Sequence, residues 1–189
     1  KYLYKYPQSA FPYDDLVATN RQRGRTDPEY ELIDTGVFND DRYFDVLVEY
    51  AKVAPDDILI KISASNRGKA SAPLHVLPTF WFRNTWAWWP DQPKPTLRDV
   101  NGSIAASSGL NLHFDAHSPL LFTENETNNQ RLFGTDNGSP YVKDGINDFV
   151  VSGRQDAINP NNAGTKAAGY YYATIDAGAT AVFRLRLNA

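Results

Sequence analysis

The chain of 189 residues contains no cysteine, no methionine and no long run of apolar residues. The absence of cysteine excludes thiol catalysis and cysteine-ligated zinc. No apolar run approaches the ~20 residues that a membrane-spanning helix needs, so we expect no membrane partner. Charge of one sign is also scarce: the formal net charge is −3 with both signs interspersed. Nucleic-acid binders carry a basic stripe or a high pI, so we predict no nucleic-acid partner.

The absence of methionine means that Lys1 is not a translational start, and we expect a soluble piece of a longer protein. The first residues lack the charged and apolar segments of a signal peptide. With no cysteine either, this pattern predicts a cytoplasmic location. A chain of this length buries ~70% of its unfolded surface and folds without a metal or disulfide. No cofactor motif is present, and we predict no cofactor.

Tryptophan is concentrated in one place: all four indoles lie within residues 80–90, F-W-F-R-N-T-W-A-W-W-P. Each indole brings ~150–250 Å² of largely apolar area that seeks a partner. The stretch is therefore core, an interface or a platform for sugar rings. We expect a strand to end near Asn84, so that Trp86, Trp88 and Trp89 project from a loop, where sugar rings and a domain interface suit them equally.

A period of two dominates the rest of the chain and predicts β-strands. Apolar residues recur at every second position in 58–65, 110–117 and 181–188 and define one face of each segment. Further strands are expected at 30–38, 43–52, 74–83, 119–124, 148–152 and 169–176. Short strands with one apolar face and close turns predict an all-β fold, an antiparallel sandwich. We expect one or two short helices, over 13–23 and from Asp144, and a long polar loop at 154–168.

Two polar groups are candidates for chemistry. His113, Asp115 and His117 alternate on one strand face and form a ligand set for zinc or iron. Strand residues two apart lie ~7 Å from each other, a poor span for one ion, so we favour a polar outer face. Glu124 and Glu126 are a carboxylate pair of the kind used in glycoside hydrolysis. We favour solvated acids at a strand end.

Five runs of residues carry a family resemblance: A-F-P-Y-D-D-L-V (10–17), D-T-G-V-F-N-D-D-R-Y-F-D-V (34–46), L-P-T-F-W-F-R-N-T-W (77–86), L-L-F-T-E-N-E-T-N (120–128) and P-Y-V-K-D (140–144). Together they resemble bacterial proteins related to glycoside hydrolase family 63, the glucosidase or mannosyl-oligosaccharide glucosidase-like group. The similarity extends over nearly the whole chain.

The resemblance implies a two-part enzyme, with an N-terminal β-supersandwich, similar to galactose mutarotase, packed on an (α/α)6 barrel. In that family the barrel supplies the general acid and general base, and hydrolysis inverts the anomeric carbon. This chain matches the β part only. Residues 1–189 are then a single β-sandwich domain, its partner is the barrel of its own polypeptide, and no catalytic residue is carried over.

We predict that six residues line the substrate cleft or meet the barrel: Arg83, Asn84, Trp86, Trp88, Trp89 and Glu124. The first functional hypothesis is a non-catalytic domain that shapes the cleft of an α-glucosidase and is inactive alone. The second is an autonomous carbohydrate-binding module that binds oligosaccharide by stacking sugars on Trp86, Trp88 and Trp89. The third is a small enzyme that pairs Glu124 with Asp45 or Asp115.

Overall fold

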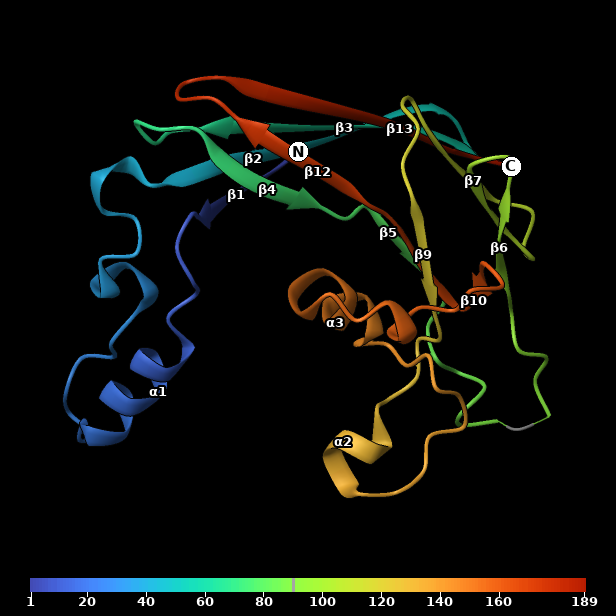
Figure 1. Cartoon of the computed structure of the whole chain (residues 1–189), viewed down its shortest axis with the longest axis horizontal. Helices are drawn as coiled ribbons and strands as arrows, with labels where there is room; N and C mark the ends of the chain where they lie inside the picture. Colours follow the sequence, from blue (N-terminus) through green and yellow to red (C-terminus); the bar gives the residue numbers. More distant parts are fainter. Residues whose placement is uncertain (90) are drawn as a thin grey trace. The chain divides into compact units, whose positions relative to one another are not determined.

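The computed structural model describes residues 1–89 and 91–189 (Figure 1). About 38% of the residues are in strands and 18% in helices, and the sheets are large and antiparallel. This confirms the predicted fold class, an all-β sandwich with few short helices. Pro90, the last residue of the tryptophan-rich stretch, lies outside the described residues. Within the described ranges, no helix has the length and apolar character needed to cross a membrane.

The structure contains short strands joined by turns and a few short helices. The strands are β1 (Tyr2–Pro7), β2 (Tyr43–Ala54), β3 (Asp57–Asn66), β4 (Ala72–Val76), β5 (Thr79–Trp81), β6 (Leu97–Val100), β7 (Ser103–Ala106), β8 (Asn111–Phe114), β9 (Leu120–Thr123), β10 (Ala163–Gly164), β11 (Lys166–Gly169), β12 (Tyr171–Ile175) and β13 (Thr180–Asn188). The helices are α1 (Tyr13–Gln22), α2 (Asn129–Phe133) and α3 (Gly145–Ser152), with 3-10 turns η1 (Leu32–Thr35), η2 (Asn39–Asp41) and η3 (Gln155–Ala157).

Pairing groups the strands into sheets of eight, three and two. Their orders are β1-β2-β3-β13-β8-β7-β6-β10, β5-β11-β9 and β12-β4. The chain also divides into two compact units: unit 1 is Lys1–Glu49, Lys61–Leu74 and Ala173–Phe183, and unit 2 is Tyr50–Ile60, His75–Tyr172 and Arg184–Ala189. The boundary between the units falls within five strands: β2, β3, β4, β12 and β13. That residues 1–189 form a single domain stays a prediction.

In unit 1 a buried asparagine joins segments that are distant in sequence. Asn66 is fully buried at the end of β3. Its side-chain nitrogen donates to the carbonyls of Ala70 and Ile175, both at 2.8 Å. Its side-chain oxygen accepts from the side chain of Gln8 at 2.6 Å and from the backbone of Gly68 at 2.8 Å. The buried amide is therefore fully hydrogen-bonded, and it links the segments that contain Gln8, Ala70 and Ile175; we call it a polar staple.

In unit 2 a buried apolar cluster forms between α3 and the three-stranded sheet β5-β11-β9. Leu121 of β9, Ile146 of α3 and Ala168 of β11 form one buried cluster, with α3 lying against β9 (Figure 1). Close backbone approach requires glycine at two positions: a Cβ on Gly164 would lie 2.2 Å from the carbonyl oxygen of Thr123, and one on Gly145 would lie 2.4 Å from that of Ala157. This sheet places Trp81, the last residue of β5, beside Lys166 of β11, and Trp86, Trp88 and Trp89 follow in the next loop.

Most of the predicted elements are confirmed, and the exceptions have physical reasons. Residues 30–38 are not a strand: η1 forms because the Asp34 carboxylate accepts the backbone N–H of Glu31 at 2.8 Å and Gly36 takes a left-handed conformation. The prediction of a strand at 148–152 is also wrong. These residues end α3, where apolar side chains three and four apart face the core, and burial overrides β propensity. Residues 154–168 contain η3, β10 and part of β11, so they are not a plain loop.

Candidate functional site

The tryptophan loop (residues 82–89) follows β5, and hydrogen bonds to its backbone fix where it leaves the sheet. The backbone N–H of Phe82 donates to the carbonyl of Thr165 at 3.0 Å, which extends the pairing of β5 with β11 by one residue. The carbonyl of Phe82 accepts from the side chain of Asn125 at 2.9 Å. The N–H groups of Trp88 and Trp89 then both donate to the Thr85 carbonyl, at 3.0 and 3.2 Å. Trp86, Trp88 and Trp89 therefore lie in a loop, as predicted, although the strand before it, β5, ends at Trp81 and not near Asn84.

A lysine and two glutamates hold this loop at its base, and we call Lys94, Glu124, Glu126 and Trp86 the Trp86 clamp. The ammonium of Lys94 lies 3.1 Å from Glu124 Oε2 and 2.7 Å from Glu126 Oε1. Glu126 Oε1 also accepts the indole N–H of Trp86 at 2.9 Å. On the other side, the Thr165 hydroxyl donates to Glu124 Oε2 at 2.7 Å. Lys94 thus bridges the two carboxylates, and Glu126 in turn binds the Trp86 indole.

Burial and the neighbouring charges shift the pKa values of Glu126 and Lys94 in opposite directions. Burial alone raises the pKa of Glu126, but the hydrogen bonds from Lys94 and Trp86 outweigh it and hold that pKa below its ordinary value. Burial likewise lowers the pKa of Lys94, and the bonds to Glu126 and Glu124 outweigh it, so the pKa is raised. The lysine and Glu126 therefore stay charged across the neutral pH range.

A pocket of about 340 Å³ opens beside the clamp. It is lined by Asn84, Trp86, Ala87, Glu126, Thr127, Asn129 and Gly138. Its size falls at the small end of the range for small-molecule sites. Trp88 and Trp89 are absent from this lining, although they are neighbours of Trp86 in sequence.

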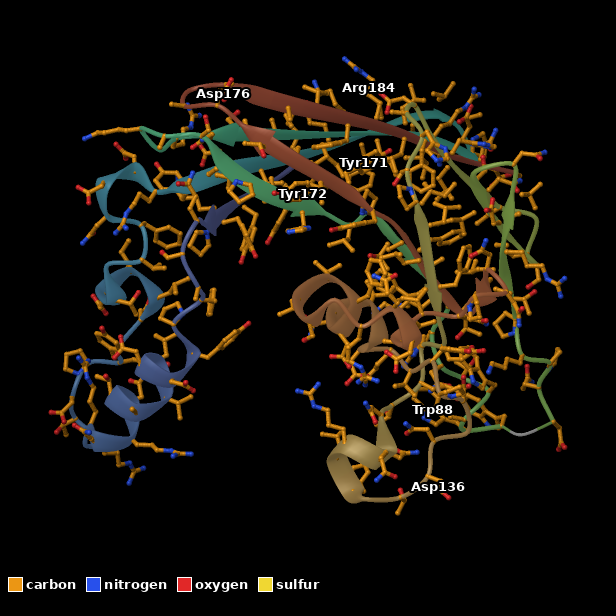
Figure 2. The ribbon with its side chains drawn as sticks, in the orientation of Figure 1. Trp88, Asp136, Tyr171, Tyr172, Asp176 and Arg184 are labelled. Atoms are coloured by element: carbon orange, nitrogen blue, oxygen red, sulfur yellow. The ribbon has the colours of Figure 1, made fainter. Side chains whose placement is uncertain are left out.

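Trp88 and Trp89 form a separate, outward-facing pair. Each is 56% exposed, and their rings meet edge to face with centroids 5.7 Å apart. The guanidinium of Arg83 lies 5.0 Å from the centre of the Trp88 ring, a cation–π distance. Figure 2 shows Trp88 on the same side of unit 2 as α2 and the loop that carries Asp136. That this exposed aromatic pair meets a partner stays a prediction.

The six predicted site residues therefore fall into three groups, and their roles stay predictions. Asn84 and Trp86 line the pocket, Arg83 accompanies Trp88 and Trp89, and Glu124 belongs to the clamp. The expectation of solvated glutamates is wrong, because the side chains of Glu124 and Glu126 are only 17% and 24% exposed and both contact Lys94. Sequence reasoning missed Lys94 and Asn129, and it considered Glu126 only as the partner of Glu124 without counting it among the six site residues. The i, i+2 spacing of the glutamates, which places both on one side of an extended chain, was the available signal.

The other carboxylates and histidines considered for chemistry have different partners. Both ring nitrogens of His113 are in hydrogen bonds at 2.9 Å, to Ser103 and Asn188. Asp115 pairs with Arg184 at 3.8 Å. Asp45, in unit 1, is bound by Lys5 at 2.9 Å and Arg67 at 2.7 Å. Among residues 1–89 and 91–189, no group of three or more His, Asp or Glu side chains is arranged to hold a metal ion.

Comparison with known proteins identifies a similar protein in yeast. The chain is 36% identical over 213 aligned positions to an uncharacterized protein of Saccharomyces cerevisiae, YMR196W. The alignment covers 91% of this chain and 20% of the yeast protein, so the chain spans about a fifth of the length of its relative. No family model matches the chain.

Proposed function

We propose that this chain is the non-catalytic β-sandwich domain of a larger protein resembling a family 63 glycoside hydrolase. Its role is to pack on a helical catalytic barrel and to shape the substrate cleft of an inverting α-glucosidase. One observation carries the proposal: the two carboxylates of the Trp86 clamp, Glu124 and Glu126, are both paired with Lys94. Inverting hydrolysis needs an acid and a base free to exchange protons on either side of a sugar. Glu124 and Glu126 position the loop instead.

The alignment with the yeast protein supports the same proposal. That relative has about four-fifths of its length outside the aligned region. A domain that meets the remainder of its own polypeptide needs an apolar contact surface, and Trp88 and Trp89 supply exposed aromatic area in unit 2. The chain would then contribute a wall of the cleft while the chemistry resides elsewhere.

The test is to assay the purified chain on α-glucosides, alone and together with the barrel of a family 63-like relative produced separately. We expect no turnover from the chain alone, and co-purification with the barrel that weakens at least tenfold in Trp88→Ala. Tyr172→Ala is the control, since Tyr172 is another exposed aromatic of unit 2 outside the tryptophan loop. Turnover by the pure chain, or no association with the barrel, would remove the proposal.

The second candidate is a carbohydrate-binding module, and the exposure of Trp88 and Trp89 favours it as well. Flat indoles at a surface present apolar faces to sugar rings without any partner domain. In that case Trp88→Ala abolishes oligosaccharide binding by the isolated chain and leaves it folded. Titration of wild type and variant with α-gluco- and α-manno-oligosaccharides separates this candidate from the first, in which the exposed pair meets protein.

A further inference from the structure

The edge strand β1 has one side of its backbone open. It is the first strand in the order of the eight-stranded sheet, and among the described residues it pairs with β2 alone. The backbone N–H of Gln8 continues this pairing by donating to the Arg42 carbonyl at 3.0 Å. Backbone groups alternate from side to side along a strand, so the even-numbered residues of β1 bind β2. The N–H and C=O groups of Leu3 and Lys5 therefore point to the open edge.

Three tyrosines make one face of this strand apolar and free of charge. Tyr2, Tyr4 and Tyr6 alternate along β1 and share a face, and the rings of Tyr4 and Tyr6 lie 6.2 Å apart. The three residues are 63%, 42% and 46% exposed. An exposed edge strand with apolar side chains is a template for pairing with another strand.

The charges of β1 restrict which second strand can pair with it. Lys1 and Lys5 lie on the face opposite the tyrosines, and each has a counter-ion on β2: Lys1 Nζ lies 3.3 Å from Glu49 Oε1, and Lys5 Nζ lies 2.9 Å from Asp45 Oδ1. Like charges directly opposite each other destabilise a strand pair. A strand that places no cation opposite these two lysines avoids that cost.

A second copy of β1 meets this requirement when the two strands run antiparallel with Tyr4 opposite Tyr4. Lys5 then lies opposite Leu3, and Lys1 lies opposite Pro7. The smallest shift that keeps the tyrosines on one face moves the register by two positions, and it places Lys5 opposite either Lys5 or Lys1. Larger shifts leave most of the strand unpaired. Charge therefore selects the register centred on Tyr4.

We propose that β1 pairs with β1 of a second copy of this chain, antiparallel and centred on Tyr4, so that two sheets join edge to edge. In this register Leu3 and Lys5 of the second copy exchange both backbone N–H···O=C bonds, once on each side of the symmetry axis. Pro7, which has no N–H, lies at the end of the strand and removes no bond from its middle. The tyrosines of both copies form one continuous ladder. The inference does not depend on the proposed function.

The size of the interface sets the expected affinity. Six tyrosines that each expose about half of ~200 Å² bury roughly 600 Å², so the interface stays below the ~1,200 Å² of standard complexes. Interfaces at this end of the range are weak, and we expect a Kd of order 100 µM.

The first experiment is sedimentation velocity of the chain from about 10 to 500 µM, over which a dimer of this affinity forms. Tyr4→Lys places two lysines opposite each other on the axis, and we expect it to raise the Kd at least tenfold, that is by about 1.4 kcal/mol or more. Tyr13→Lys is the control, because it makes the same change at an exposed tyrosine of unit 1 outside the sheet. Circular dichroism checks that both variants are folded.

The second experiment tests the register by cross-linking with oxidised glutathione. The chain has no cysteine, so an introduced one reports on a single position. Tyr4→Cys should form a disulfide-linked dimer, because Cα atoms in a non-hydrogen-bonded antiparallel pair lie ~4.5 Å apart, within reach of a disulfide. Tyr2→Cys alone should stay monomeric, since Tyr2 faces Tyr6. A mixture of Tyr2→Cys and Tyr6→Cys should cross-link.

The outcomes separate the β1 edge from other surfaces. A monomer throughout the concentration range overturns the proposal, and so does a dimer that persists in Tyr4→Lys. Cross-linking of Tyr2→Cys as readily as Tyr4→Cys overturns the register. A dimer that is lost in Trp88→Ala but not in Tyr4→Lys assigns self-association to the exposed tryptophan pair and overturns pairing through β1.

Discussion

The Trp86 clamp makes a quantitative prediction for Lys94→Met, which keeps the length of the side chain and removes its charge. Two carboxylates that are 17% and 24% exposed would then face each other without a cation. Removing one partner of a fully buried pair costs about 3–5 kcal/mol, whereas an exposed pair is worth about 0–1 kcal/mol. Since Lys94 is 40% exposed and partly screened by water, we expect unit 2 to lose about 1–2 kcal/mol near neutral pH.

The dependence on pH distinguishes a lost charge from a lost contact. The folded pKa of Glu126 lies below the ordinary value of 4.5, so its stabilising contribution is present above that pH and is lost as the pH falls through the folded pKa. The folded pKa of Lys94 lies above 10.5, so its contribution is complete below that pH and is lost as the pH rises through the folded pKa. The cost of Lys94→Met should therefore be greatest between about pH 6 and 9, and small near pH 3.

The assay is urea unfolding followed by tryptophan fluorescence, which reports on unit 2 because all four indoles lie there. The control is Lys52→Met, since Lys52 lies in unit 2, is exposed and has no ion pair among the described residues. We expect the midpoint of Lys94→Met to fall at about pH 7 and to approach that of the control at about pH 3. Equal midpoints for the two variants at pH 7, or a loss that persists unchanged at pH 3, would refute the clamp.

Three further substitutions test the fold around the site. Asn66→Leu leaves the carbonyls of Ala70 and Ile175 unpaired in unit 1 and should cost about 3–4 kcal/mol in thermal unfolding; a loss below about 1 kcal/mol would contradict its role as a polar staple. Gly164→Ala places a Cβ 2.2 Å from the Thr123 carbonyl and should cost about 2–4 kcal/mol by urea unfolding, and wild-type stability would show that the backbone approach is not close. Trp88→Ala should change the unfolding free energy by less than about 1 kcal/mol, because the side chain is 56% exposed; circular dichroism showing an unfolded variant would mean that Trp88 is core.

The strand pattern was predictable because it depends on local geometry. Residues Ile60, Ile62 and Ala64 alternate with Lys61, Ser63 and Ser65, and β3 forms there with the apolar positions more buried. Residues 181–188 behave in the same way in β13. The helix after Pro12, with its acidic first turn, forms as α1. Each of these signals is contained in a few consecutive side chains, and the backbone period converts it directly into a face.

Residues 30–38 and 148–152 were mispredicted because their local signals conflict with their contacts. The segment Phe149, Val150 and Val151 has β-branched and aromatic side chains typical of a strand. Phe149 and Val150 instead pack on Leu121 and Ala168 from α3, and burial of a helical face outweighs a propensity worth less than ~1 kcal/mol. The contact partners belong to other strands, so no window around residue 150 contains them.

The sequence by itself determined the all-β class, the position of the helix after Pro12 and the concentration of aromatic surface in the tryptophan loop. Only the tertiary structure decided that Lys94 neutralises Glu124 and Glu126, and that Trp86 faces a pocket while Trp88 and Trp89 face outward. Side-chain periodicity follows from backbone geometry within one element, and it can be seen in a linear sequence. The meeting of a lysine with glutamates about thirty residues away depends on how strands and loops pair in space, which local periodicity does not encode.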